Sequence, residues 1–445
     1  MRAPLLLPLA ALLSACSWSR FDDLTTDTPV VVLERPGEIR SGFGTSLSSV
    51  SDDDGRALLL VHGASGYAQA ALFDLRNGED PLTSASSDSV CSNDGGTCYL
   101  GSSSAPLARV RSPSGKALEN CFAVGVGKKL NDAVPGIVIE CESRDVFTLD
   151  APEDFANAAQ LSFSREPEVV ALASDGAEPP ALVVGSEQRN TAFFYPTLDA
   201  VPVLLSAGEL STAGFGATVA VARVEDKSLI AVGSPGQAVL HLFAVETDAE
   251  PAYLGCVHGK SGFGRALTVG PVTRNDDLPE LAVADASEVH VFEASELLAL
   301  SPEPSDCVEL DDLPRSALYA SVSCGETGAV SGCAGGEFGA SVAIGDVDGD
   351  GDGELMVGAP GMKARDASAA GAVAFFDLDA AGENRVADLK FVASAEDGDR
   401  LGASLVAARV ASRHVVAAGI PGSGRTAIFY CPSLLPEGLG GARCD

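Results

Sequence analysis

Residues 337–361 read EFGASVAIGDVDGDGDGELMVGAPG. Two short apolar runs, 341–344 and 355–357, flank an acidic, glycine-rich turn. Phe338-Gly339 precedes the first run, and a Gly-Ala-Pro sequence ends the second. Short apolar runs bounded by glycine and proline are typical of strands joined by a tight connection. The stretch therefore predicts a β-hairpin.

The same arrangement recurs along the chain. A Phe-Gly pair or a related aromatic or leucine sequence precedes an alternating apolar run, and a second run ends near glycine. The spacing of roughly 50 to 75 residues suits a four-stranded unit, and regular repetition of such units indicates a propeller. The predicted units begin at residues 42–46, 99–102, 161–164, 214–217, 262–265, 337–341 and 400–404.

This pattern resembles FG-GAP repeats, the blades of integrin α-chain propellers, over nearly all of residues 42–432. The resemblance implies an all-β, seven-bladed β-propeller of four-stranded antiparallel blades spanning residues 29–432. The architecture is physically reasonable because one such sheet cannot bury both of its faces, whereas a closed ring buries each face against a neighbour.

The two ends of the repeat region predict how the ring closes. The seventh unit has no fourth strand after Tyr430, while an apolar run at 30–33 precedes the first unit. We expect this N-terminal run to be the outer strand of the last blade. Residues 433–445 then form a C-terminal tail.

The N-terminus has the features of an export signal. Arg2 precedes an almost wholly apolar run that is too short to span a bilayer. The run ends Leu-Ser-Ala-Cys at Cys16, which resembles the lipobox of bacterial lipoproteins. That resemblance implies a signal peptide at 1–15, a lipidated Cys16 with a tether over 16–28, and an anchor in the outer membrane facing the periplasm or the cell surface. The alternative is an ordinary signal peptide with a cysteine placed by chance.

Ten further cysteines, an even number in an exported chain, predict disulfides. A hairpin centred near Asn131 would place Cys121 opposite Cys141, and three other pairs bracket short loops or the tail. Longer-range connectivity stays open. The segment 295–336 is the longest stretch outside the repeat, and we expect this inserted disulfide loop to be the partner surface. The candidates are Cys91 with Cys98, Cys121 with Cys141, Cys324 with Cys333, Cys431 with Cys444, and the remaining Cys256 with Cys307.

The acidic turn predicts a structural calcium site. Asp346, Asp348 and Asp350 occupy loop positions one, three and five, where carboxylates converge on one hard cation. Gly351 permits the tight turn, Asp352 can offer its carbonyl, and Glu354 supplies a carboxylate at position nine. The related integrin-like loops usually carry Asp at position nine, so the resemblance leaves the coordination by Glu354 open. Metal binding by the shorter acidic turns at 52–54 and 275–277 also stays open.

The remaining features argue against several function classes. A formal net charge of −33 excludes a phosphate backbone as a natural partner. No complete catalytic signature is present, so we expect no enzyme. His241 and His290 occupy matching places in third strands, and we interpret them as ordinary strand residues. We expect a monomeric envelope lipoprotein that binds a protein or glycan as an interaction or adhesion module. The alternatives are a lectin-like propeller, a periplasmic scaffold, and a hydrolase or lyase with its site at the propeller axis.

Overall fold

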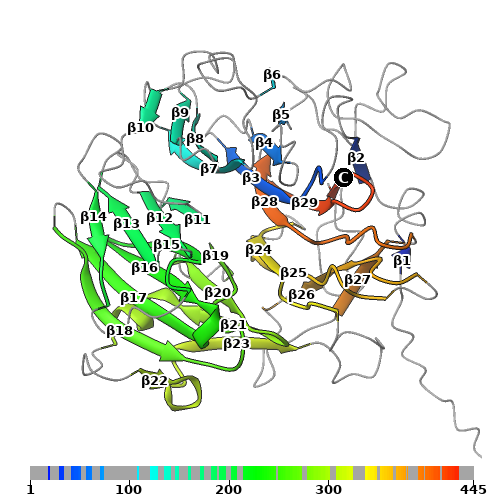
Figure 1. Cartoon of the computed structure of the whole chain (residues 1–445). Helices are drawn as coiled ribbons and strands as arrows, with labels where there is room; N and C mark the ends of the chain where they lie inside the picture. Colours follow the sequence, from blue (N-terminus) through cyan, green and yellow to red (C-terminus); the bar gives the residue numbers. More distant parts are fainter. Residues whose placement is uncertain are drawn as a thin grey trace, which may run out of the picture.

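The computed structural model describes a chain of short strands grouped into small sheets (Figure 1). Within the described residues the strands form seven sheets. The described residues are 19–20, 30–34, 42–51, 57–62, 71–74, 108–109, 121–128, 135–141, 146–149, 159–161, 171–174, 182–187, 190–196, 202–207, 214–246, 249–272, 278–300, 307–323, 336–347, 351–363, 367–376, 378, 389–394, 396–410 and 413–429.

The first three sheets are antiparallel meanders in which each strand pairs with the next one along the chain. The first contains β3 (Ser46–Ser51), β4 (Ala57–His62), β5 (Ala71–Asp74) and β6 (Ala108–Arg109). The second contains β7 (Cys121–Lys128), β8 (Pro135–Cys141), β9 (Val146–Leu149) and β10 (Ala159–Leu161). The third contains β11 (Ala171–Ser174), β12 (Leu182–Ser186), β13 (Thr191–Tyr195) and β14 (Val203–Leu205).

The fourth and fifth sheets are linked by the inserted segment. The fourth contains β15 (Thr218–Val224), β16 (Lys227–Ser234), β17 (Val239–Glu246) and β18 (Ala252–His258), with the short helix η3 (Pro235–Gln237) between β16 and β17. The fifth contains β19 (Ala266–Gly270), β20 (Glu280–Ala284), β21 (Glu288–Glu293) and β23 (Leu318–Ser323). Between β21 and β23 lie α2 (Ala294–Leu298), β22 (Val308–Glu309) and η4 (Leu310–Asp312).

The last two sheets include strands from the N-terminal region. The sixth contains β24 (Ser341–Gly345), β25 (Glu354–Gly358), β26 (Ala372–Phe376) and β27 (Leu389–Ala393), and β1 (Ser19–Arg20) adds to it in parallel with β27. The seventh contains β28 (Leu405–Val410), β29 (Arg413–Ile420), β30 (Arg425–Phe429) and β2 (Val30–Glu34).

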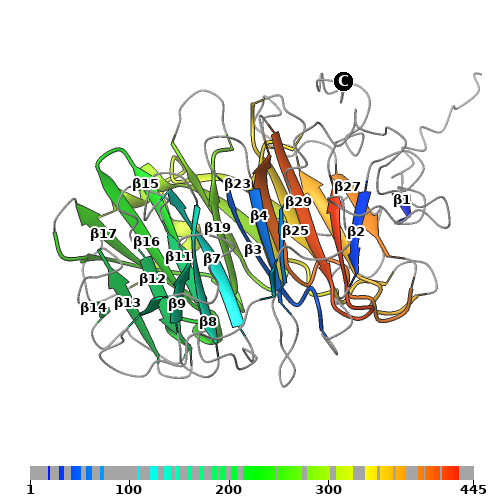
Figure 2. The same ribbon diagram turned by 90° about the horizontal axis from the view of Figure 1, so that it is seen from above.

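Figure 1 shows the sheets arranged around a common centre, and Figure 2 shows the same ring turned by 90°. The first strands of neighbouring sheets pack against one another in chain order, and β28 of the last sheet packs against β3 of the first. The apolar cores lie between adjacent sheets, as the buried clusters shared by the fifth and sixth sheets and by the sixth and seventh sheets show. The chain is therefore a closed β-propeller, as the repeats predicted.

The ring is closed by the N-terminal strand, as predicted. All five residues of β2 pair antiparallel with β30, from Val30 opposite Phe429 to Glu34 opposite Arg425. Val32 and Leu33 are buried, at 4% and 2% exposure. The edge strand therefore contributes side-chain burial to the interfaces on both sides of its sheet.

The phenylalanines of the Phe-Gly pairs are wedges between sheets. Phe43, Phe215, Phe263 and Phe338 are all buried, and Leu401 holds the same place in the seventh unit. Three of these rings meet an aromatic ring of the third strand edge to face, namely Phe243, Phe292 and Phe376. Large buried rings of this kind dominate core energetics, which explains why an aromatic recurs at this place.

The paired glycines let neighbouring sheets approach closely. A Cβ on Gly419 of β29 would lie 1.8 Å from the carbonyl oxygen of Gly44, at the closing interface. Gly233 and Gly358 meet the carbonyls of Gly264 and Gly402 in the same way, at 2.3 and 2.1 Å. A hydroxyl completes the closing contact, because Ser404 Oγ donates to the Gly44 carbonyl oxygen over 2.8 Å. The glycines of the repeat thus allow the close approach of neighbouring sheets, and at the closing interface a serine hydroxyl adds a hydrogen bond to it.

The structure corrects several predicted boundaries. The unit starts at 99–102 and 161–164 are wrong. β6 follows the first of these ranges and β10 ends at the first residue of the second, and both are outer strands of the preceding sheets. The inserted loop at 295–336 is also too long, since Leu318–Ser323 is the outer strand of the fifth sheet. Part of the tether at 16–28 forms β1. Among the described residues, no helix is long and apolar enough to cross a membrane.

Candidate functional site

The acidic loop connects β24 to β25, the place expected from the sequence. Asp346, Asp352 and Glu354 belong to the described residues, whereas Asp348 and Asp350 lie outside them. The Gly351 N–H donates to Asp346 Oδ2 over 3.1 Å, and Gly351 has a φ of +99°. The loop therefore turns back on its first carboxylate through the glycine at position six.

Glu354 closes the base of this loop. The Val347 N–H donates to Glu354 Oε2 over 2.6 Å, and the side chain is only 2% exposed. Asp352 is also largely buried, at 6% exposure. Carboxylate oxygens are the donors that a hard cation such as Ca²⁺ prefers, so the described side chains have the chemistry of the predicted site.

The loop lies at the junction of three sheets. The Gly353 N–H donates to the Val272 carbonyl, just after β19 of the fifth sheet, and a Cβ on Gly353 would lie 1.9 Å from the Pro271 carbonyl oxygen. On the other side, the His414 N–H of the seventh sheet donates to the Asp346 carbonyl over 2.9 Å. A cation bound here would brace neighbouring sheets as well as one hairpin.

The fifth sheet contains a counterpart that sequence reasoning missed. Glu280, at the start of β20, is fully buried, and its Oε2 accepts a hydrogen bond from the Val272 N–H over 2.6 Å. Pro271 stands where the sixth sheet has Asp346. Because this glutamate makes the same bond without an acid at position one, the bond of Glu354 does not depend on an ion. The sequence could have indicated this similarity, because a Gly–x–Val sequence precedes each loop and a glutamate follows it.

Two of the predicted cysteine pairs can be compared with the structure, and both agree with it. Cys256 and Cys307 form a disulfide. Cys121 is the register partner of Cys141 across β7 and β8, as the predicted hairpin requires, although their side chains lie outside the described part. The remaining predicted cysteines also lie outside it: Cys16, Cys91, Cys98, Cys324, Cys333, Cys431 and Cys444.

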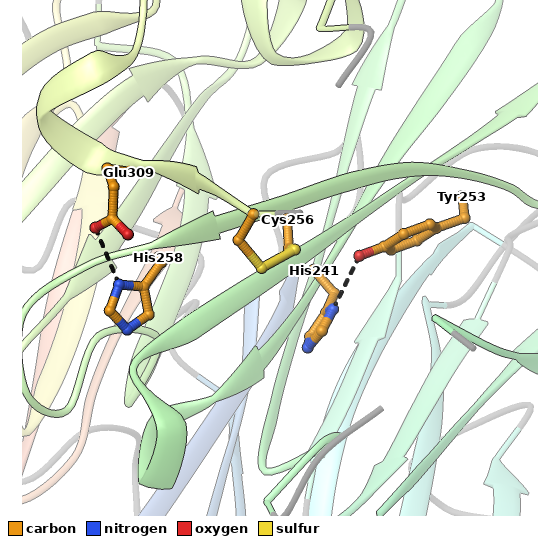
Figure 3. The surroundings of a disulfide bond; sticks show 6 residues. His241, Tyr253, Cys256, His258 and Glu309 are labelled. Atoms are coloured by element: carbon orange, nitrogen blue, oxygen red, sulfur yellow. Dashed lines mark hydrogen bonds and ion pairs between the residues drawn. A yellow bond between two sulfur atoms is a disulfide. The ribbon is translucent and has the colours of Figure 1, made fainter. Parts of the chain in front are cut away.

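The disulfide attaches the inserted segment to the fourth sheet (Figure 3). Next to it, β22 pairs in parallel with the end of β18, and His258 Nδ1 lies 3.0 Å from Glu309 Oε2. Ala294 and Leu297 of α2 are buried in the core shared by the fourth and fifth sheets. We call residues 294–317 the stapled segment, because both of its described parts, 294–300 and 307–317, are held against the propeller.

His241 is a buried histidine with a polar contact on one side. Its Nδ1 lies 3.3 Å from the Tyr253 hydroxyl (Figure 3), and the Phe215 ring lies against it edge to face. Burial lowers the pKa of His241 to about 4, from an ordinary value of 6.5. The imidazole is therefore neutral in the folded protein at neutral pH.

This shift predicts acid sensitivity. The unfolded chain takes up a proton below pH 6.5 that folded His241 accepts only near pH 4, so stability is lost as the pH falls through this window. The loss attributable to His241 should approach about 3 kcal/mol. Urea unfolding at pH 7 and pH 4.5 should show a smaller acid loss in His241→Gln than in the wild type. Equal losses in both proteins would contradict the assignment.

A further cluster was not foreseen from the sequence. Donor atoms of Asp285, Glu288 and His290 lie within 4.8 Å of one another at the β20–β21 turn. From the sequence alone, His290 is interpreted as an ordinary strand residue, and its place in this cluster is new. The sequence feature that could have indicated the cluster is the spacing of His290, which follows Glu288 by two residues and Asp285 by five.

Comparisons with known proteins agree with the geometry. The family model described as FG-GAP repeat matches residues 338–376, which span β24 to β26. The likeness to an FG-GAP repeat therefore covers three strands of the sixth sheet. No curated protein sequence matches the chain.

Solved structures resemble the whole ring. One is BBS1N in complex with ARL6DN, in a mercury-soaked crystal, with a TM-score of 0.51, 12% identity, and coverage of 90% of this chain and 97% of that chain. A lead-soaked crystal of the same complex gives a TM-score of 0.50, 11% identity, and coverage of 91% and 98%. The WD40 repeats of RRP9 give 0.51, 11% identity, and coverage of 90% and 97%. At these identities the likeness is one of fold, and it extends beyond the single FG-GAP repeat.

Proposed function

We propose that this chain is a lipid-anchored envelope protein whose propeller binds a protein partner and catalyses no reaction. The stapled segment carries the proposal. It is not needed to close the ring, yet a disulfide, a helix packed into the core and an added parallel strand hold it in place. Rigid loops on a stable scaffold are where binding functions concentrate.

The charge of this segment indicates the kind of partner. Asp311 and Asp312 of η4 are exposed beside Glu309, and the whole chain has a net charge of −33. Complementary charge favours association and sets the orientation of partners, so the fitting partner is a protein with a basic surface. The BBS1N neighbour was crystallised in complex with ARL6DN, so a propeller of this general fold can hold a protein partner.

Crosslinking in native envelopes tests this proposal. A chain with a photoreactive residue at position 315, which is exposed in the stapled segment, should crosslink to one basic protein. Asp311→Asn with Asp312→Asn should weaken the crosslink, whereas Glu187→Gln with Glu225→Gln, two exposed acids elsewhere, should not. Equal crosslinking by both double variants would refute the role of the segment. Palmitate labelling, with Cys16→Ala as control, tests the anchor.

Calcium at the 346–354 loop would have a structural role in this protein. The chelator EGTA should lower the melting temperature, because removing a ligand present at 100 times its Kd removes about 2.7 kcal/mol of stabilisation. Asp346→Asn should have a lower melting temperature and a reduced response to EGTA. An unchanged melting temperature in EGTA would count against a bound ion.

A further inference from the structure

We propose that Asp285, Glu288 and His290 form a second metal site, which binds a first-row divalent transition ion of the zinc class and is separate from the calcium loop. His290 Nε2 lies 3.2 Å from Asp285 Oδ2 and 3.7 Å from Glu288 Oε2. Ligands at about 2.0 to 2.2 Å from a tetrahedral ion are separated by roughly 3.4 Å. The two observed separations lie on either side of this value.

The supporting contacts fix two of the three donors. Asp285 Oδ1 accepts hydrogen bonds from the Ser287 and Glu288 N–H groups, both over 2.7 Å, which leaves Oδ2 facing the imidazole. His290 Nδ1 lies 2.9 Å from Ser321 Oγ, and this contact directs Nε2 toward the carboxylates. Hydrogen bonds that orient ligands from behind are a regular feature of metal sites.

The cluster is open to solvent on one side only. Asp285 and His290 are 0% and 4% exposed, while the Glu288 side chain is 27% exposed. An ion could enter on the glutamate side and keep a water molecule there. One imidazole with carboxylate oxygens suits Zn²⁺ and its neighbours better than Ca²⁺.

The fourth sheet provides an internal comparison. In the fourth sheet, Val232 pairs with His241, and Ser234 pairs with Val239. In the fifth sheet, Val283 pairs with His290 in the same way, and the Asp285 N–H donates to the Glu288 carbonyl. The three positions thus hold Ser, Val and His in the fourth sheet and Asp, Glu and His in the fifth. A buried histidine at this place therefore needs no acids to fold into the sheet. The two carboxylates are a feature of the fifth sheet that the fold does not require.

Lys260 is the competitor for this ion. Its Nζ lies 2.7 Å from Glu288 Oε2, and its side chain is 59% exposed. A mobile ammonium on the solvent side can be displaced by a divalent ion at some cost in affinity. Removing this ammonium should therefore strengthen metal binding, which a purely structural ion pair would not predict.

The test uses untagged, oxidised protein in excess calcium, so that neither a histidine tag nor the calcium loop contributes. Equilibrium dialysis should give one bound Zn²⁺ per chain. Glu288→Gln, at a partly exposed position, should keep the melting temperature without zinc and weaken binding at least about tenfold. Lys260→Met should bind zinc more tightly than the wild type. His258→Gln, which alters the exposed pair of His258 and Glu309, should bind like the wild type.

Spectroscopy separates this site from any cysteine site. X-ray absorption of the bound zinc should show nitrogen and oxygen neighbours including one imidazole, and no sulfur. Zinc binding that is equal in the wild type and Glu288→Gln, sulfur in the first shell, or no binding at all would each overturn the proposal.

Discussion

Gly419→Ala is expected to destabilise the protein by about 3 kcal/mol, through the interface that closes the ring. The added methyl group would lie 1.8 Å from the Gly44 carbonyl oxygen and 2.5 Å from Ser404 Oγ. Both neighbours are fixed, since Ser404 Oγ donates to that same carbonyl and the Gly419 N–H donates to the Ser404 carbonyl. The clash must be relieved by separating the first and last sheets. Urea unfolding measures the loss.

The fifth sheet supplies the matched control. It already has Ala284 at the position that corresponds to Gly419, and it packs against Gly339 of the next sheet. Ala284→Gly should therefore change stability by no more than about 1 kcal/mol. Hydrogen exchange should show faster opening of β2 and β30 in Gly419→Ala. Equal unfolding midpoints for the two variants would contradict the closing contact.

Phe338→Ala is expected to cost about 3 to 5 kcal/mol. The ring is 1% exposed and meets Phe376 edge to face, with centroids 6.2 Å apart. It belongs to the core between the fifth and sixth sheets, so truncation would leave a cavity at that interface. Thermal and urea unfolding should both show the loss.

Phe338→Leu separates the wedge from the aromatic ring. Leu401 holds the equivalent place in the seventh unit and is fully buried. A leucine at 338 should therefore cost only roughly 1 kcal/mol. A loss as large as that of the alanine variant would mean that the aromatic contact, rather than filled volume, stabilises this interface.

Much of the fold could be predicted because the repeat has a physical cause at each position. Phe338 is a wedge, Gly358 permits a close approach, and Ser341 Oγ donates to the Gly402 carbonyl across the interface. These requirements leave a readable pattern in the sequence. The role of the N-terminal strand followed from a missing fourth strand at the other end of the repeat region.

The failures have equally physical causes. The predicted second unit begins before β6, and the predicted third unit begins at the last residue of β10. Both starts are wrong because, without a clear Phe-Gly pair, nothing in the local sequence distinguishes an outer strand from an inner one. The buried bond of Glu280 depends on a backbone N–H, which composition does not reveal. The cluster around Asp285 forms because a turn folds back over its own third strand, and spacing alone did not distinguish it from a solvated turn.

The pairing of β2 with β30 sets an order of events during synthesis. Val30 is among the earliest residues of the propeller to be made, and its partner Phe429 is among the last. The nascent chain must keep its first strand available while six sheets assemble, because the seventh is complete only when both ends are present. An incomplete translation product would therefore retain an exposed sheet edge, so quality control by proteases could recognise unfinished molecules.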